Sequence, residues 1–271
     1  MTDRAPTGDL DRWPAAPFTA GGVTHDVHRR GEGPGVVLVP EIPGLTPQVL
    51  GLADHLVDAG FTVAVPSPFG TPGRPPTAGA VLEVLPRLCV SREFRAFATE
   101  VRRPFTDWLR RLAVDLDART PGPGVGVIGM CFTGGFALAA AVEGAVLASV
   151  LSQPAAPFPV GRRRAANAGL STADLDVVAE RAARGEVCAL GLRFSEDAGV
   201  PHARFATLRA RLGDAFEVLE LDSSPGNPGG FARSAHSVLT NEVRERPGHP
   251  ALEARERVVA FLRERLAPAA T

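Results

Sequence analysis

The sequence predicts an α/β domain, in which a mostly parallel central sheet is flanked by helices on both faces. Short apolar runs alternate along the chain with amphipathic stretches, which is the pattern of parallel strands joined by helices. The chain has 271 residues, of which 45% are hydrophobic, so one large domain can bury a sizeable core. We expect a flexible N-terminal segment over residues 1–20 and a single domain over residues 21–271.

The predicted strands are short apolar runs, and the first of them is expected at an exposed edge of the sheet. They cover residues 23–29, 35–42, 61–69, 124–130, 145–152, 187–194 and 215–221. The predicted helices have apolar residues near helical spacing or an excess of small residues. They cover residues 47–59, 100–119, 134–142, 172–184 and 250–266.

The segment from residue 70 to about residue 90 has no clear periodicity and is rich in proline and glycine at its start. An irregular excursion of this length within a compact domain is usually a lid or a binding loop. We therefore expect a lid-like excursion at about residues 70–100.

Charge and composition exclude several classes of function. The formal net charge of -1 provides no basic field for nucleic acid, and no apolar run is long enough to cross a membrane. The N-terminal residues lack the apolar core of a signal peptide. Three scattered cysteines, Cys89, Cys131 and Cys188, do not form a disulfide framework and are expected as free thiols in the cytoplasm.

The segment Gly129-Met130-Cys131-Phe132-Thr133 lies where a predicted strand turns into a predicted helix. A nucleophile on such a sharp turn requires small residues two positions before and after it. Gly129 and Thr133 meet this requirement, and the N-terminus of the helix favours a thiolate at Cys131. The alternative is a buried structural cysteine in a glycine-rich turn. We expect Cys131 to be the nucleophile.

An acid and a histidine follow the nucleophile in the order that triad hydrolases of this kind use. Asp197 comes directly after a predicted buried strand, at the edge of the sheet where active sites form, and Glu196 is its rival. His236 lies in the loop after the last predicted strand, where a general base can reach the nucleophile. We expect the other five histidines to have structural or surface roles: His25, His28, His55, His202 and His249.

Acyl transfer also requires backbone donors for the oxyanion that develops on the substrate. One is expected from Phe132, the residue after the nucleophile, and the other from Ile42, after the strand at residues 35–42. The carboxylate of Glu41 beside Ile42 is costly to bury without a partner, so it either faces solvent or interacts with the thiol or the histidine.

These residues together resemble the dienelactone hydrolase family. The resemblance rests on Gly-Met-Cys-Phe-Thr-Gly-Gly at the turn, Pro-Glu-Ile-Pro-Gly-Leu at the strand end, the Asp-x-x-Val-Pro segment at Asp197, and the late His236. It extends from about residue 23 to residue 266. It implies an α/β-hydrolase fold, a Cys-His-Asp triad of Cys131, His236 and Asp197, and neither a metal nor an organic cofactor. It also implies that Glu41 modulates the nucleophile.

The sequence departs from the family pattern in two places. The family histidine is usually followed by Gly-Phe, whereas His236 is followed by Ser237 and Val238. Family enzymes that cleave dienelactone hold its carboxylate with arginines. The candidates here are Arg92, Arg95 and Arg233, and an exposed surface role is the alternative for each.

The sequence therefore predicts a cysteine-dependent hydrolase that cleaves a small-molecule ester or lactone through a thioester. The alternative is a non-catalytic or sensing protein of the same fold that binds a small carbonyl ligand. A thiol-based redox role is disfavoured because no Cys-x-x-Cys motif is present. We expect a monomer or weak homodimer that binds neither nucleic acid nor membrane.

Overall fold

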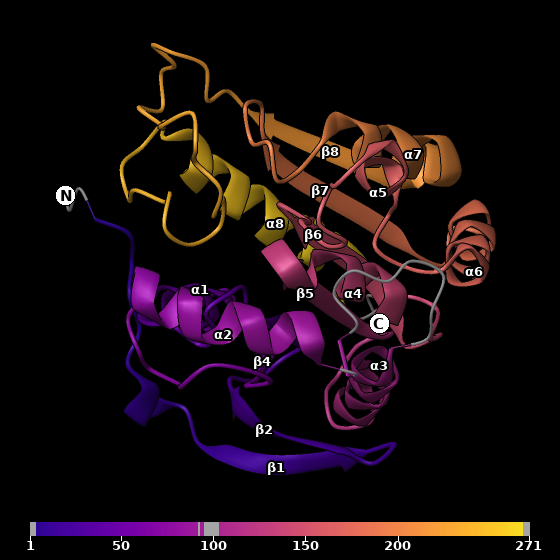
Figure 1. Ribbon diagram of the computed structural model, residues 1–271. Helices are drawn as coiled ribbons and strands as arrows, with labels where there is room; N and C mark the ends of the chain where they lie inside the picture. Colours follow the sequence, from indigo (N-terminus) through magenta and orange to yellow (C-terminus); the bar gives the residue numbers. More distant parts are fainter. Residues whose placement is uncertain (1–3, 92, 95–102, 268–271) are drawn as a thin grey trace.

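The computed structural model describes residues 4–91, 93–94 and 103–267. Eight strands form one sheet in the order β1-β2-β4-β3-β5-β6-β7-β8, and Figure 1 shows it extending from β1 in indigo to β8 in orange. β1 and β2 pair antiparallel, β2 pairs antiparallel with β4, and the remaining neighbours are parallel. The strands are β1 (Ala15–Ala20), β2 (Val23–Arg30), β3 (Gly35–Val39), β4 (Thr62–Pro66), β5 (Val125–Met130), β6 (Val146–Ser152), β7 (Cys188–Phe194) and β8 (Phe216–Leu221).

Helices connect the parallel strands, as the alternating pattern predicts. Several begin at recognisable capping residues: Thr46 caps α1 by accepting from the Val49 amide, and Ser171 caps α6 in the same way. The helices are α1 (Pro47–Asp58), α2 (Ala78–Val90), α3 (Pro104–Asp117), α4 (Gly134–Ala140), α5 (Arg162–Ala166), α6 (Thr172–Ala183), α7 (His202–Leu212) and α8 (Pro250–Leu266).

The sheet separates two apolar cores, which confirms the predicted α/β fold class. Alternate residues of β3 enter opposite cores: Val37 and Val39 face one, and Val36 and Leu38 face the other. Apolar side chains of α2, α3, α4, α6 and α7 complete the first core. Those of α1 and α8 complete the second. No helix among the described residues is long and apolar enough to cross a bilayer.

The N-terminal prediction was wrong in part. Residues 15–20, expected in a flexible segment, form the edge strand β1, and β2 is therefore an inner strand rather than the edge. The side chains of β1 are exposed or half-buried, so the segment lacks the apolar run by which the other strands were identified. Its pairing with β2 supplies the backbone hydrogen bonds that hold it in the sheet.

The expected lid-like excursion also contains regular structure. Residues 78–90 form α2, whose first turn is capped by the Thr77 side chain. Pro86 within this helix and the prolines before it conceal the helical pattern in the sequence. Val84 and Leu88 are buried in the first core, so this part of the segment packs on the domain.

Strand register places the predicted site residues at one edge of the sheet. Val39 of β3 pairs with Gly129 of β5, and Met130 of β5 pairs with Ser152 of β6. Phe194, the last residue of β7, pairs with Leu221 of β8. The loops that follow these parallel strands therefore meet at the carboxyl edge, where α/β proteins carry their sites.

Candidate active site

Cys131 lies on a strained turn between β5 and α4. Its φ of 54° falls in the left-handed region, which a residue other than glycine rarely adopts. The turn is also crowded, because a Cβ on Gly129 would lie 2.3 Å from the carbonyl oxygen of Thr133. Backbone strain of this kind is found at functional sites when the surroundings hold it in place. The structure thus has the tight strand-to-helix turn that the spacing around Cys131 predicts.

Thr133 ties this turn to the end of β3. Its Oγ1 accepts a hydrogen bond from the Met130 amide at 2.9 Å. The same hydroxyl lies within hydrogen-bond distance of the carbonyls of Val39 and Pro40, at 3.1 and 3.2 Å. A hydroxyl donates one proton at a time, so these carbonyls share a single donor. Thr133 therefore has a positioning role that its small size alone did not predict.

His236 contacts Asp197 and is close enough to Cys131 for the charge of that residue to act on it. Its Nδ1 is 2.6 Å from Oδ2 of Asp197. Burial opposes the charged imidazole, but the charge of Cys131 and the hydrogen bond to Asp197 outweigh it and raise the pKa of His236 to about 11. The structure thus brings the predicted base, His236, against the predicted orienting acid, Asp197.

The two acids that compete in the sequence have different partners. Asp197 is 9% exposed, and its Oδ1 accepts a hydrogen bond from the Gly199 amide at 2.9 Å while Oδ2 contacts His236. Glu196 points elsewhere and forms an ion pair with Arg233 at 2.8 Å. The structure therefore places Asp197, and not its neighbour, beside the imidazole.

Arg233, a candidate for binding a substrate carboxylate, has a side chain that is 71% exposed in its ion pair with Glu196. It would have to leave this pair to bind a substrate. Arg92 and Arg95, the other two candidates, lie outside the described residues. Their role stays a prediction.

The two expected oxyanion donors follow the ends of two neighbouring strands, β3 and β5. Phe132 is fully buried in the first turn after Cys131, and Ile42 follows the end of β3 next to β5. Phe69 and Phe158 are half-buried, and their ring centroids lie 6.3 and 6.4 Å from that of Phe132, the residue after Cys131. Aromatic side chains therefore pack around the residue next to the thiol.

Glu41 is buried, with an exposure of 3%, and does not face solvent. Its Oε2 accepts hydrogen bonds from Gln153 Nε2 at 3.0 Å and from Ser237 Oγ at 2.9 Å. Its Oε1 accepts one from Thr240 Oγ1. Gln153 and Thr240 are not among the predicted site residues. Gln153 follows the last residue of β6 at the carboxyl edge, and its position there was the signal that could have identified it.

His25, His28, His202 and His249 have contact partners other than Cys131, Asp197 and His236. His202 is exposed at the start of α7, as expected. His249 is the residue before α8 but is buried rather than on the surface. The pKa of His55 is lowered to about 4, chiefly by burial and then by the charge of Arg255. Within the described part of the chain, no three His, Cys, Asp or Glu side chains are grouped as a metal site would require.

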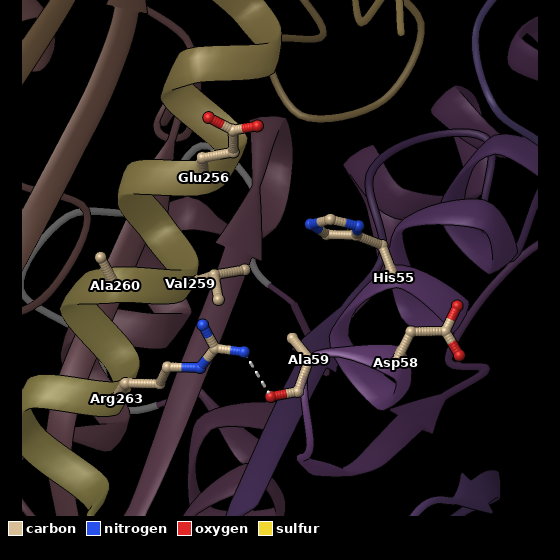
Figure 2. Close-up of a pocket in the computed structure, with 7 residues that line it drawn as sticks. All are labelled: His55, Asp58, Ala59, Glu256, Val259, Ala260 and Arg263. Atoms are coloured by element: carbon tan, nitrogen blue, oxygen red, sulfur yellow. Dashed lines mark hydrogen bonds between the residues drawn. The ribbon is translucent and has the colours of Figure 1, made fainter.

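A separate cavity of about 340 Å³ lies between α1 and α8 (Figure 2). It is lined by His55, Asp58, Ala59, Glu256, Val259, Ala260 and Arg263. Arg263 donates a hydrogen bond across it to the carbonyl of Ala59 at 2.8 Å. Because α1 runs from the carboxyl edge of β3 back to the start of β4, this last turn of α1 lies at the opposite edge of the sheet from Cys131.

Solved structures of similar fold include several hydrolases. A promiscuous phosphotriesterase, described as dienelactone hydrolase-like and obtained from metagenomic libraries, has a TM-score of 0.64 at 17% identity, over 94% of this chain and 98% of that one. A dienelactone hydrolase from Anabaena variabilis has a TM-score of 0.57 at 14% identity, over 94% and 98% of the two chains. At these identities the likeness shows the fold alone.

No curated protein sequence matches the chain. The family comparison, in contrast, covers most of the chain, because the model of the dienelactone hydrolase family matches residues 23–266. The matched region contains the turn at Cys131, the acid at Asp197 and the late His236. The chain therefore belongs to the dienelactone hydrolase family of α/β hydrolases.

Proposed function

We propose that this hydrolase cleaves a carboxylic ester or lactone through a thioester formed on Cys131. The observation that carries the proposal is the 2.6 Å contact of His236 with Asp197, and the influence of the Cys131 charge on the pKa of His236 supports it. A cysteine held at a positive φ on a strand-to-helix turn, with a charged imidazole beside it, is suited to nucleophilic attack. Membership of a hydrolase family supports the same class of reaction.

In the first half of the reaction, the Cys131 thiolate attacks the carbonyl carbon of the substrate. The electron pair of the carbonyl moves onto its oxygen, and the backbone amides of Ile42 and Phe132 stabilise that oxyanion. As the intermediate collapses, His236 donates its proton to the leaving alcohol oxygen. The products of this step are an alcohol and a thioester; for a lactone, the alcohol remains attached to the acyl group.

In the second half, water attacks the thioester. His236, now neutral, takes a proton from this water, and the same amides stabilise the second oxyanion. Collapse of the intermediate releases the carboxylic acid and returns Cys131 to its thiolate and His236 to its charged form. Asp197 keeps the imidazole in one orientation throughout and stabilises its positive charge.

The environment of the thiol favours an apolar or aromatic acyl group. Phe69 and Phe158 are half-buried and pack against Phe132, the residue after Cys131. The nearby Arg233 is already paired with Glu196. We therefore infer that esters and lactones without a carboxylate on the acyl group are the better substrates.

The test is a screen of short chromogenic esters and lactones with the wild type, Cys131→Ala and Cys131→Ser. The proposal expects wild-type hydrolysis that Cys131→Ala abolishes. Equal activity in Cys131→Ala would overturn it. A ligand that raises the melting temperature of the wild type without any hydrolysis would instead support the non-catalytic binding protein.

A further inference from the structure

The buried carboxylate of Glu41 is held by three neutral donors. These are Gln153 Nε2, Ser237 Oγ and Thr240 Oγ1. Removing a carboxylate from water is costly unless hydrogen bonds replace those lost, so each of these donors matters to the position of Glu41. Within the described residues, Glu41 takes part in no ion pair, which leaves its position dependent on these bonds.

Two of the three donors belong to the loop that carries His236. Ser237 is the next residue, and Thr240 follows three positions later. The loop is compact, because the amides of Thr240 and Glu242 both donate to the Ser237 carbonyl, at 3.3 and 3.2 Å. Any displacement of Ser237 from Glu41 would therefore be transmitted directly to the backbone of His236.

The third donor joins Glu41 to the strand beside the nucleophile. Gln153 follows β6 with a φ of 36°, a strained value for a residue with a side chain. Two residues later, the Ala155 amide donates to the carbonyl of Cys131 at 2.8 Å. Glu41 thus connects the end of β3, the end of β6 and the histidine loop at a single point.

The charged groups Glu242 and Arg244 do not form an ion pair with Glu41 among the described residues. Burial raises the pKa of Glu242, and the charge of Glu41 adds to this effect, whereas Arg244 opposes it. Arg244 itself donates to the carbonyls of Asn241 and Val243. The charges of Glu242 and Glu41 therefore repel each other.

We propose that Glu41 is a positioning residue that fixes the His236 loop over Cys131, with Ser237 as the direct link. This inference rests on the proposed chemistry of Cys131, and it differs from the direct action on the nucleophile that the family resemblance implies for Glu41. It also gives a reason for Ser237 at the position where the family usually has glycine, because glycine has no hydroxyl to donate to the carboxylate.

The test measures how fast iodoacetamide alkylates Cys131 between about pH 5 and about pH 9, because only the thiolate reacts. Ser237→Ala removes the link to Glu41 without changing charge. We expect a less firmly held His236, slower alkylation of Cys131 at neutral pH, and a kcat about 10- to 100-fold lower at a similar KM. Ser237→Thr keeps the hydroxyl and should restore both.

Ser234→Ala is the matched control, since Ser234 is exposed on the same loop. It should leave the profile and kcat unchanged. Thr240→Val tests the second bond, and Thr240→Ser should restore its effect. Variants are compared only where thermal unfolding shows a folded protein. An alkylation profile and kcat that are unchanged in both Ser237→Ala and Thr240→Val would overturn the proposal.

The alkylation profile requires no substrate and so separates the two proposals. If the wild type hydrolyses no ester or lactone, the proposed function fails, whereas slower alkylation in Ser237→Ala still supports the positioning role. If hydrolysis depends on Cys131 and the profile is unchanged, the positioning role fails alone.

Discussion

The Nδ1 atom of His236 lies 2.6 Å from Oδ2 of Asp197, although the two residues are 39 positions apart. Asp197 has its other oxygen bonded to the Gly199 amide, so its carboxylate is held at both ends. This fixed acid orients the imidazole; burial opposes a charge on that ring, but the charge of Cys131 favours it. The following predictions depend on this arrangement and on the frame around it.

The two neighbouring acids should differ strongly in their effect on catalysis. Asp197→Asn is expected to lower kcat by roughly 10³- to 10⁴-fold, because the imidazole loses the group that fixes its tautomer and stabilises its charge. Glu196→Gln removes only the exposed pair with Arg233 and should retain kcat within about threefold. Steady-state kinetics of both variants check this. A comparable loss in Glu196→Gln would reassign the acid.

The charge on His236 should depend on Cys131. With the pKa of His236 raised to about 11, its imidazole stays charged at about pH 8 in the wild type. Cys131→Ala removes the charge that favours this form and leaves the burial that opposes it, so the midpoint should fall. NMR titration of the C2 proton of His236 measures the midpoint in the wild type and in Cys131→Ala. Identical midpoints in the two proteins would contradict the ion pair.

The same shift predicts how stability changes with pH. The folded-state pKa of His236 lies above the ordinary value of 6.5, so the folded chain binds the proton more tightly than the unfolded chain. The resulting stabilisation is fully present below about pH 6.5 and is lost as pH rises toward about 11. Urea unfolding at several pH values in this range measures the free energy of unfolding. This free energy should fall more steeply with pH for the wild type than for His236→Gln. Parallel curves would count against the shift.

The turn at Cys131 should not accept a methyl group at Gly129. A Cβ there would lie 2.3 Å from the Thr133 carbonyl and 2.9 Å from the Ala137 Cβ. Gly129→Ala is therefore expected to destabilise the fold by about 2 kcal/mol or more. At Gly144 a Cβ would have no neighbour within 4 Å, so Gly144→Ala should change stability by less than about 0.5 kcal/mol. Chemical unfolding of Gly129→Ala and Gly144→Ala tests this prediction. Equal denaturant midpoints in the two variants would show that the turn can relax around the added methyl group.

Arg204 on α7 should be important for stability, although it forms no ion pair among the described residues. It is fully buried, and burial lowers the pKa of its guanidinium to about 10. Its donors bond to the carbonyls of Pro154, Pro157, Arg164 and Asn167. Arg204→Met leaves these buried acceptors unpaired and should cost about 3 kcal/mol or more.

The control for Arg204 lies on the same helix. Arg209 is exposed, and Arg209→Met should change the free energy of unfolding by less than about 0.5 kcal/mol. If Arg204→Met were as stable as Arg209→Met, the loop after β6 would not depend on the buried guanidinium.

The sequence predicts the frame of the site well because its signals are local. The apolar run of β5, the small residues around Cys131 and the order of acid and histidine can each be identified without the fold. Most strand and helix boundaries agree within a few residues, and α8 agrees at both ends. The competition between Glu196 and Asp197 could not be decided in this way, because it depends on which side chain the loop turns toward His236.

The features that were missed depend on contacts between distant segments. The strand β1 has no apolar run and is defined by its pairing with β2. The partners of Glu41 lie 112, 196 and 199 positions away in the chain, so its hydrogen bonds have no local signature. Arg204 is another case, since arginine is usually exposed and its acceptors are backbone carbonyls that any residue offers.

The identity of the acylated residue is the most direct test of the proposed thioester. Rapid quenching of the wild type with a chromogenic ester of a short apolar acid, followed by intact mass and peptide mapping, detects the intermediate. The proposed mechanism predicts one added acyl group on the peptide that contains Cys131, and none in Cys131→Ala. An acyl group on another residue, or full turnover by Cys131→Ala, would contradict it.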